Sequence, residues 1–397
     1  MDRSWAQPVS VGVVSAVIGV TSSFAVVLAG LTAAGADPAQ AASGLVVLTA
    51  LMGVATIWLS RRFRRPLMVA WSTPGAALLA STGAVAGGWP AVVGAFVVGG
   101  LLIVATGLVR PLGRLVGAIP APIAQAMLAG VLLPLCLAPV RALVERPLLV
   151  APIVVLWVVL SRFAPRWASP AAFGLALVIV VVLADGWSWL RPPEIALTAP
   201  AFSVAALVGV ALPLWVVTMA SQNVPGVAVL AAAGYPVPWR YAMVLTGAGT
   251  VLGAPAGAHA INLAAITAAL PASPESHPDP ARRWVACQAN GVACLLLAPL
   301  ATTMAALVAA APPGVVESVA GLALLGTFGA ALAGALAVAD PTPDPAVARV
   351  PPAVAFLVSA AGVTVAGIGA AFWGLLAGVV LHLALRRRAT GRPTAAA

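Results

Sequence analysis

The sequence contains an apolar segment with a break in its middle, MVAWSTPGAALLA, at residues 68–80. The first four residues suit an extended conformation, and the tetrapeptide STPG that follows interrupts any helix. Ser72 or Thr73 can cap a new helix, and Pro74 suits its first turn. The sequence therefore predicts a short extended stretch and then a half-helix whose N-terminus lies within an apolar segment.

A second interrupted segment occurs in the other half of the chain, GAPAGAHAINLAAIT, at residues 253–267. Residues 253–258 predict a break, and residues 259–267 are predicted as the helix that follows. A short extended stretch is expected in this broken segment as in the first. Two such N-termini facing one place would each offer unpaired N–H groups and roughly half a positive charge, which can hold a carboxylate without a buried Arg. The alternative, that each break is a kink for helix packing, stays open.

The composition predicts an all-α polytopic membrane protein in a lipid bilayer. Of the 397 residues, 62% are hydrophobic and 8% are charged, which cannot cover a water-facing surface of that size. Soluble enzymes, coiled coils and disulfide scaffolds are excluded. The formal net charge of +10 does not indicate a nucleic-acid partner, because the Arg residues are scattered between apolar stretches. No cofactor and no metal site are predicted.

About fourteen apolar segments can be placed along the chain, given that a full crossing needs roughly 20 residues. They are residues 8–34, 41–60, 67–83, 88–109, 120–140, 147–163, 169–185, 202–222, 240–253, 257–270, 283–309, 314–339, 352–367 and 369–386. Several are too short to cross alone, notably the third, ninth and tenth, so a count of twelve stays open.

Arginine placement favours the count of fourteen. With the N-terminus inside, seventeen of the twenty basic residues fall on the inside, and only Arg141, Arg146 and Arg191 fall outside. Both termini are therefore predicted to be cytoplasmic, with residues 389–397 as a disordered tail. The connection at 186–200 divides the segments into seven and seven, and an odd number per half inverts the second half relative to the first, as in many secondary transporters.

Polar and aromatic residues near the first break and in the eighth segment are candidates for substrate contact. Gln222 needs a partner at membrane depth and is predicted to face the site, with a helix cap near the cytoplasm as the alternative. Trp71 directly precedes the first break, so a flat apolar substrate could stack on it or on Phe24. Core packing is the alternative for both rings.

His259 is the one titratable side chain beside the predicted site. Proton-coupled carriers usually use an intramembrane Asp, Glu or His, and none of the ten carboxylates lies in the middle of a predicted segment. With an ordinary pKa of about 6.5, His259 suits a proton switch. The alternative is a neutral structural His that donates to a backbone carbonyl.

Three stretches carry a family likeness: WSTPGAALL at 71–79, SQNVPG at 221–226 with Gly234-Tyr235, and the run from Ala254-Pro255 through HAINLAAITAA at 259–269. They resemble the signature stretches of the BenE benzoate:proton symporter family, and the likeness extends over essentially the whole chain. The resemblance implies an inner-membrane carrier that imports benzoate or a related aromatic carboxylate with a proton. It also implies the seven-plus-seven inverted-repeat fold of uracil and ascorbate carriers and of anion exchangers.

By that resemblance, a core domain of residues 1–109 and 202–310 moves against a gate domain of residues 110–201 and 311–388 in an elevator-like cycle. The oligomeric state stays open, with a homodimer as one alternative. Uracil-type carriers place Glu in the eighth and tenth segments. This sequence has none there, which argues against a nucleobase and leaves two proton carriers open, His259 and the substrate carboxylate itself.

The predicted site holds the carboxylate between the N-termini at 73–75 and 257–259, with side-chain donors nearby and the ring against the aromatic pair. Its residues are Phe24, Trp71, Ser72, Thr73, Gly75, Gln222, Gly257, His259 and Asn262. One alternative is an uncoupled or exchanging anion carrier on the same scaffold. The other is an intramembrane enzyme, which would need a nucleophile, a metal cluster or a carboxylate pair that the sequence does not offer at a suitable spacing.

Overall fold

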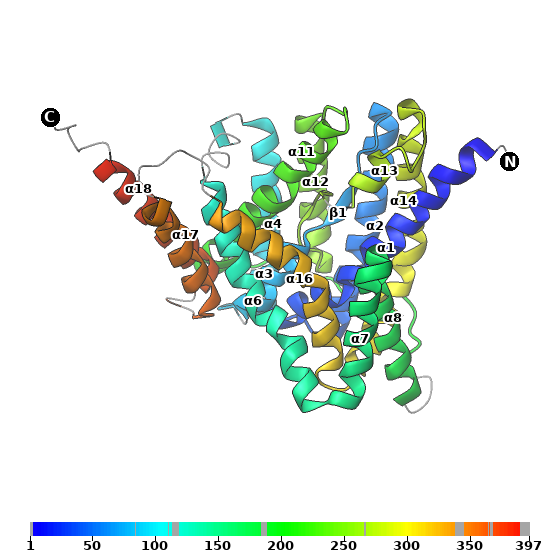
Figure 1. Ribbon diagram of the computed structural model, residues 1–397, viewed down its shortest axis with the longest axis horizontal. Helices are drawn as coiled ribbons and strands as arrows, with labels where there is room; N and C mark the ends of the chain where they lie inside the picture. The colour runs from blue at the N-terminus through cyan, green and yellow to red at the C-terminus, as the bar shows by residue number, and fades with distance from the viewer. Residues whose placement is uncertain are drawn as a thin grey trace.

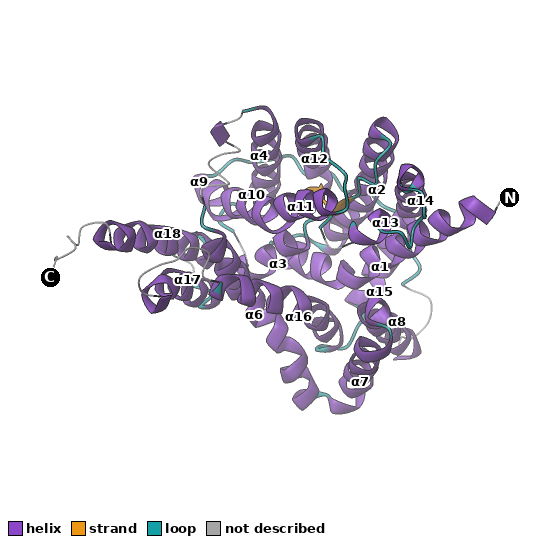
Figure 2. Ribbon diagram, turned by 45° about the horizontal axis from the view of Figure 1, so that its top comes forward, coloured by secondary structure: helices purple, strands orange, loops and turns teal. Residues whose placement is uncertain are grey.

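The computed structural model describes residues 3–83, 85–109, 111–112, 119–183, 189–265, 267–337, 345–363, 365 and 368–389. These residues form a helical protein with a two-stranded sheet among the helices, as Figure 1 and Figure 2 show. The predicted all-α class and the short extended stretches in the two broken segments are confirmed. The predicted tail lies, apart from Ala389, outside the described residues.

The helices of the first half are α1 (Arg3–Ala33), α2 (Pro38–Phe63), α3 (Thr73–Thr82), α4 (Gly88–Leu108), α6 (Ala121–Glu145), α7 (Pro147–Phe163) and α8 (Pro165–Leu183). The second half begins with α9 (Val204–Ala206), η1 (Leu207–Ala211), α10 (Leu212–Thr218), η2 (Met219–Asn223) and α11 (Val224–Ala232), in which η1 and η2 are π-helical. It continues with α12 (Trp239–Gly253), η3 (Ala254–Ala256), α13 (Ala269–Ala272), η4 (Pro280–Arg282), α14 (Trp284–Leu297), η5 (Ala298–Leu300), α15 (Ala301–Ala309), α16 (Val315–Leu336), α17 (Pro345–Ala360) and α18 (Ala370–Ala389).

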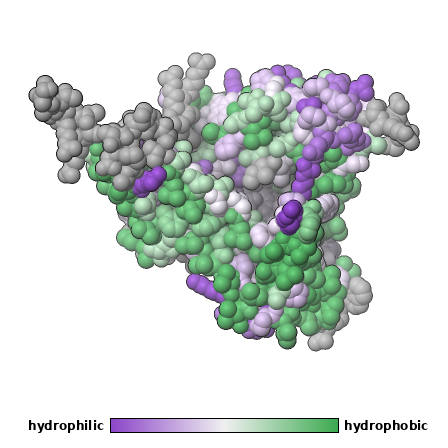
Figure 3. All heavy atoms as spheres, viewed as in Figure 1, coloured by the Kyte–Doolittle hydropathy of each residue, from purple (hydrophilic) through white to green (hydrophobic). Residues whose placement is uncertain are grey.

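Helix length and apolar surface make the chain a multi-pass membrane protein. Eight stretches of the described residues are long and apolar enough to cross a membrane, and three shorter helices are apolar as well. Many large apolar side chains are exposed on them, including Leu148, Val182 and Leu296. Figure 3 shows hydrophobic residues over most of the lower and left part of the visible face, with hydrophilic residues gathered mainly along the top. Such a surface suits contact with lipid.

The start of α2 shows how local sequence sets an element boundary. Asp37 Oδ1 accepts a hydrogen bond from Gln40 N at 2.8 Å, and Gln40 Oε1 accepts one from Asp37 N at 3.0 Å, a capping box with Pro38 in the first turn. The helix ends where Arg64 adopts a left-handed conformation with φ 51°. The chain then leads within a few residues into the first strand.

The helices pack as two groups. In the first group, α1 packs on α2, α3 and α14, and α4 packs on α12; in the second, α6 packs on α16 and α17, α17 packs on α18, and α7 packs on α8. The groups meet where α1 contacts α8 and α16 and where α3 contacts α6. Figure 2 shows α6, α16, α7 and α8 along one side of the molecule, with α1 and α3 next to them.

The two strands are β1 (Val69–Trp71) and β2 (Ile261–Leu263), which pair antiparallel although they are remote in the sequence. A further hydrogen bond extends the pairing, from Ser72 N to Ala260 O at 2.9 Å. Five of the six paired residues are buried, so the ladder lies inside the protein. The pairing therefore joins the third and tenth apolar segments through their backbones.

Threonine side chains from the preceding helices close the outer edges of this ladder. Thr56 Oγ1 of α2 accepts a hydrogen bond from Val69 N at 2.9 Å, and Thr250 Oγ1 of α12 accepts one from Ile261 N at 3.1 Å. All four residues are buried, so these hydroxyls satisfy N–H groups that water does not reach. The same arrangement, a strand whose first N–H binds a Thr of the helix before it, thus occurs in both halves.

The helix predicted for residues 259–267 is wrong, because these residues include β2 and α13 begins only at Ala269. Gly257, with φ +88°, ends η3 and turns the chain, and Ala258 N bonds to Gly253 O at 3.1 Å. β1 needs a backbone partner along its length, and another extended segment is what can supply it. This tertiary requirement outweighs the helix propensity of the Ala-rich run.

The half-helix predicted after the first break is confirmed. Ser72 is the N-cap of α3, its Oγ accepts a hydrogen bond from Gly75 N at 3.1 Å, and Pro74 lies in the first turn. In the tenth segment, α13 has four residues, too few for a comparable N-terminal site. The predicted pair of facing half-helices is therefore reduced, among the described residues, to α3 alone.

Removal of the hydroxyl at the β1 edge should destabilise the protein. We expect Thr56→Val, which keeps the side-chain shape, to lower Tm, because Val69 N–H then stays buried without its acceptor at a cost of about 1–3 kcal/mol. Thermal unfolding of the purified protein in detergent measures the effect. Thr49→Val is the matched control: it is equally buried on α2, but its hydroxyl donates to Leu45 O within the helix. Equal Tm values for the two variants would contradict the role of Thr56.

Candidate functional site

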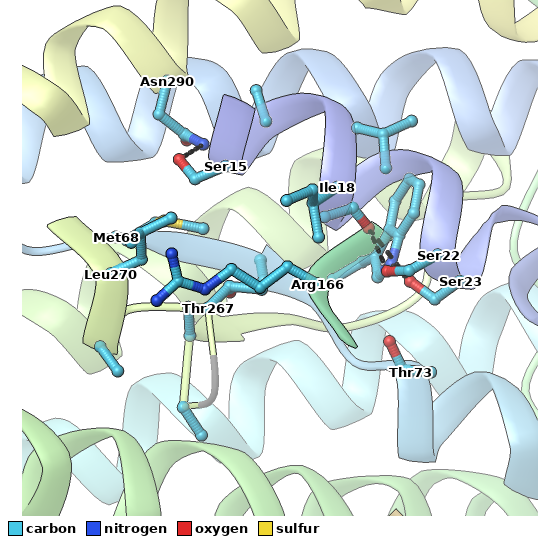
Figure 4. Close-up of a pocket in the computed structure, with 18 of the residues that line it drawn as sticks. Ser15, Ile18, Ser22, Ser23, Met68, Thr73, Arg166, Thr267, Leu270 and Asn290 are labelled. Atoms are coloured by element: carbon cyan, nitrogen blue, oxygen red, sulfur yellow. Dashed lines mark hydrogen bonds between the residues drawn. The ribbon is translucent and has the colours of Figure 1, made fainter. Parts of the chain in front are cut away.

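A cavity of about 550 Å³ lies where α1, β1, α3 and α8 meet. The chain that follows β2 and residues of η2, α14 and α16 complete its wall. Figure 4 shows side chains from several of these elements around one space. The cavity thus lies between the two helix groups, and its volume is typical of small-molecule sites, which span about 300–1,000 Å³.

The N-terminus of α3 forms one part of the wall. Thr73 and Pro74 line the cavity, and Figure 4 shows the Thr73 hydroxyl directed into it. Ser72 is fully buried, and its Oγ lies 2.9 Å from Thr218 Oγ1 while it accepts from Gly75 N. Ser72 and Gly75 therefore shape the first turn of α3, and Thr73 presents that turn to a ligand.

β1 supplies an aromatic part of the wall. Trp71 lines the cavity, and its Nε1 donates a hydrogen bond to Ser23 Oγ of α1 at 2.8 Å. Phe24 is fully buried and packs on Phe173 of α8, with the ring centroids 5.6 Å apart. Of the two predicted rings, Trp71 is therefore the one on the cavity wall, and Phe24 packs in the core.

A row of serines on α1 is a part of the wall that the sequence analysis missed. Ser15, Ser22 and Ser23 line the cavity, and Ser15 Oγ accepts a hydrogen bond from Asn290 Nδ2 of α14 at 3.0 Å. Spacings of seven and eight residues place these side chains on one face of a helix. That spacing is the signal that could have identified α1 as a wall of the site.

Gln222 lines the cavity from the π-helical stretch η2, whereas Asn262 is not on the cavity wall. Asn262 is fully buried on β2, its Nδ2 donates to Leu263 O at 2.8 Å, and its Oδ1 has no partner among the described residues. Asn223, the neighbour of Gln222, accepts a hydrogen bond from Leu263 N at 2.9 Å. The end of η2 therefore anchors β2 and also presents an amide to the cavity.

His259 and Gly257 are buried outside the described cavity wall. His259 Nε2 lies 3.0 Å from Ser72 O, and since a carbonyl oxygen can only accept, this nitrogen carries the hydrogen. Gly257 packs close to Gly44 of α2. The His259 contact is that of a structural histidine, and a role in proton coupling stays a prediction.

Arg166 and Glu275 are the two charged residues on the described cavity wall. The pair is bidentate, with Nη1 2.9 Å from Oε2 and Nη2 3.2 Å from Oε1. Hydrogen bonding and the charge of Arg166 lower the pKa of the Glu275 carboxyl. The carboxylate is therefore ionised at neutral pH, and the ion pair is lost only as the pH falls through that lowered pKa. Sequence analysis could not find this pair, because 109 positions separate its members.

A small-molecule cavity between two groups of apolar, membrane-length helices is an arrangement typical of membrane transport proteins. The benzoate membrane transport protein family, BenE, matches residues 4–384, and the chain belongs to that family. The resemblance found in the sequence is thereby confirmed. The family consists of transporters rather than enzymes.

Two relatives and two solved structures resemble the chain over most of its length. The inner membrane protein YdcO of Escherichia coli is 40% identical over 377 residues, 94% of each chain. The benzoate membrane transport protein of Acinetobacter baylyi is 30% identical over 343 residues, 84% of this chain and 83% of that protein. The transmembrane domain of the cyanobacterium bicarbonate transporter BicA has a TM-score of 0.62 at 16% identity, over 96% of this chain and 98% of that one. The murine anion transporter Slc26a9, in the inward-facing state, has a TM-score of 0.64 at 13% identity, over 98% of this chain and 69% of that one.

Engineered cysteines should map the cavity. We expect Ser22→Cys, on the cavity wall, to react with a water-soluble thiol reagent, and Ser60→Cys, at a fully buried position of α2, to stay unmodified. Both changes are made together with Cys294→Ala, because Cys294 lines the cavity and the other two cysteines are buried elsewhere. Mass spectrometry of the intact protein measures the reaction. Equal reaction of the two cysteines would contradict the placement of the cavity.

Proposed function

We propose that this protein imports benzoate or a related aromatic carboxylate, together with a proton, across the bacterial inner membrane. The observation that carries the proposal is the combination of Trp71, Thr73 and Arg166 on the wall of one cavity. An aromatic carboxylate has a flat apolar ring and an anionic end, which an indole, a helix N-terminus and a guanidinium can bind. The name of the relative in Acinetobacter baylyi supports this substrate class.

In the proposed binding mode, the carboxylate lies at the N-terminus of α3 and the ring lies against Trp71. Thr73 offers its hydroxyl, and the helix end adds a partial positive charge. Gln222 offers an amide donor from η2. No helix begins at 257–259, so the second N-terminus of the original prediction has no part in this binding mode.

The other predicted site residues support this wall from behind. Ser72 and Gly75 shape the first turn of α3, and Asn262 lies on the strand that holds β1 in place. Phe24 packs between α1 and α8. In the proposal these residues act on binding by positioning the residues that face the cavity.

We further propose that the chain crosses the membrane fourteen times, as two inverted repeats of seven segments. The antiparallel ladder supports this, because it relates the third and tenth segments by a local two-fold axis. Thr56 in the second segment and Thr250 in the ninth bind corresponding N–H groups, those of Val69 and Ile261. In Figure 1 the start of α1, at the right, and the end of α18, at the left, both lie toward the top, which suits an even number of crossings with both termini in the cytoplasm.

In the proposed elevator-like cycle, a core of residues 1–109 and 202–310 moves against a gate of residues 110–201 and 311–388. The helix contacts support this division, since α1 to α4 pack with α12 and α14, while α6 to α8 pack among themselves and with α16 to α18. The cavity lies between the two sets, so a sliding core would carry the substrate past the gate. A homodimer is the proposed assembly.

The proton has two proposed carriers, His259 and the substrate carboxylate. His259 is adjacent to α3 through Ser72 but is not on the described cavity wall. The one carboxylate on that wall, Glu275, is paired with Arg166 at an exposed position. The same observation favours a second candidate function, an uncoupled or exchanging anion carrier on the same fold.

Uptake of labelled benzoate into proteoliposomes tests these functions. We expect an inward proton gradient to drive uptake, and an excess of uracil to leave that uptake unchanged. Uptake that is independent of the proton gradient and requires an anion inside the vesicles would support the exchanging carrier instead. Uptake no greater than in protein-free liposomes would refute the aromatic carboxylate as the substrate.

A change at the α3 N-terminus should weaken substrate binding. We expect Thr73→Val to raise the half-saturating benzoate concentration about tenfold or more, because a hydrogen bond to a charged group contributes about 1.5–3 kcal/mol. Proteoliposome uptake at varied benzoate concentration measures this. Thr82→Val is the control on the same helix, because the Thr82 hydroxyl donates to Leu78 O. An unchanged half-saturating concentration for a folded Thr73→Val protein would remove Thr73 from the site.

A further inference from the structure

The Arg166–Glu275 ion pair is a feature of the cavity that the binding mode above does not explain. Both residues line the cavity, and both side chains are 58% exposed, so the pair stands at the open edge of the site. The rest of the described wall is uncharged. A carboxylate ligand that enters by this edge therefore meets one cation, Arg166, which is already paired with the Glu275 carboxylate.

The pair also connects the two helix groups. Arg166 lies in the first turn of α8, in the group with α7. Glu275 lies in the loop between α13 and η4, and Gln7 of α1 donates from its Nε2 to Glu275 O at 2.8 Å, which holds this loop on the other group. The contact therefore crosses the boundary along which the cavity opens.

The surroundings of Arg166 suit an aromatic acid. Figure 4 shows the Arg166 side chain extended along the cavity on the side where Met68, Thr267 and Leu270 lie. Met68 and Leu270 offer apolar surface to a ring, and the planar guanidinium matches a carboxylate with two parallel hydrogen bonds. The edge of the cavity thus presents both kinds of contact that the ligand needs before it reaches Trp71.

We propose that Arg166 is a first binding point for the substrate carboxylate, and that Glu275 is a built-in competitor for the same guanidinium. This inference rests on the proposed function, since it assumes an anionic substrate in this cavity. The incoming carboxylate replaces Glu275 on Arg166, with the same bidentate geometry. Exposed ion pairs are weak, so the exchange is reversible and the substrate can pass on to the α3 N-terminus.

The exchange predicts effects of opposite sign for the two members of the pair. Arg166→Gln removes the cation and should slow benzoate association about tenfold, since the first binding point loses a charge-assisted bidentate contact. Glu275→Gln removes the competitor and should speed association. The double variant should resemble Arg166→Gln, because without the cation there is nothing for which to compete.

The association rate constant of benzoate with the full-length protein in nanodiscs, followed by stopped-flow Trp fluorescence, tests this inference. Arg162→Gln on α7 is the matched control, since Arg162 is exposed and contacts the ring of Phe163 outside the cavity wall. Benzamide, which has the same shape without the charge, should associate with all variants at the same rate. Tm and size-exclusion profiles identify any variant that fails to fold, and Arg166→Lys, which keeps the charge, then replaces Arg166→Gln with a smaller expected decrease in the association rate.

The outcomes separate this inference from the proposed function. Unless Arg166→Gln slows benzoate association and Glu275→Gln speeds it, the pair is only a structural contact between helix groups and the inference is overturned, while benzoate binding by the unaltered protein still supports the function. If the folded, unaltered protein shows no saturable benzoate binding, the proposed function fails and the inference fails with it. Opposite effects for the carboxylate and none for benzamide support the exchange.

Discussion

The structure depends on the pairing of two short backbone stretches, Val69–Trp71 and Ile261–Leu263, in an interior from which water is excluded. Neither stretch is helical, so its N–H and C=O groups need partners outside a helix, and each unpaired group would cost about 1–3 kcal/mol. The strands satisfy each other along one edge, and Thr56 and Thr250 satisfy N–H groups on the outer edges. Each of the two breaks is therefore stable only because the other segment supplies the hydrogen-bond partners that its backbone needs.

This pairing also positions the candidate site. β1 leads directly into α3, so the ladder that holds Trp71 also holds the helix N-terminus at Thr73. Ser72 is held from two sides, since its N–H binds Ala260 O and its Oγ caps α3. These interior elements contribute one part of the cavity wall. The part contributed by α8 and α16 belongs to the other helix group, as the proposed movement of one group against the other requires.

The likeness to bicarbonate and anion transporters, at 16% and 13% identity, shows a shared fold, and a shared fold does not set a substrate. Substrate choice depends on the side chains at the cavity. Here the wall combines an indole, a row of hydroxyls on α1 and a guanidinium at the exposed edge. Charge is placed where water can solvate it and apolar surface is placed deeper, and for the proposed anionic substrate this order keeps the desolvation cost low at first contact.

The sequence by itself determined the membrane class, the family and the first break. Composition excludes a soluble fold, and Ser72 and Pro74 specify a cap and a first turn through contacts within a few residues. Tertiary structure decided the conformation after the second break. Residues 261–263 form a strand because β1 needs a backbone partner, and nothing in the local sequence indicates that need. It also decided that Arg166 meets Glu275 at the cavity, because the folding of separate helices against each other brings together side chains that are remote in the chain.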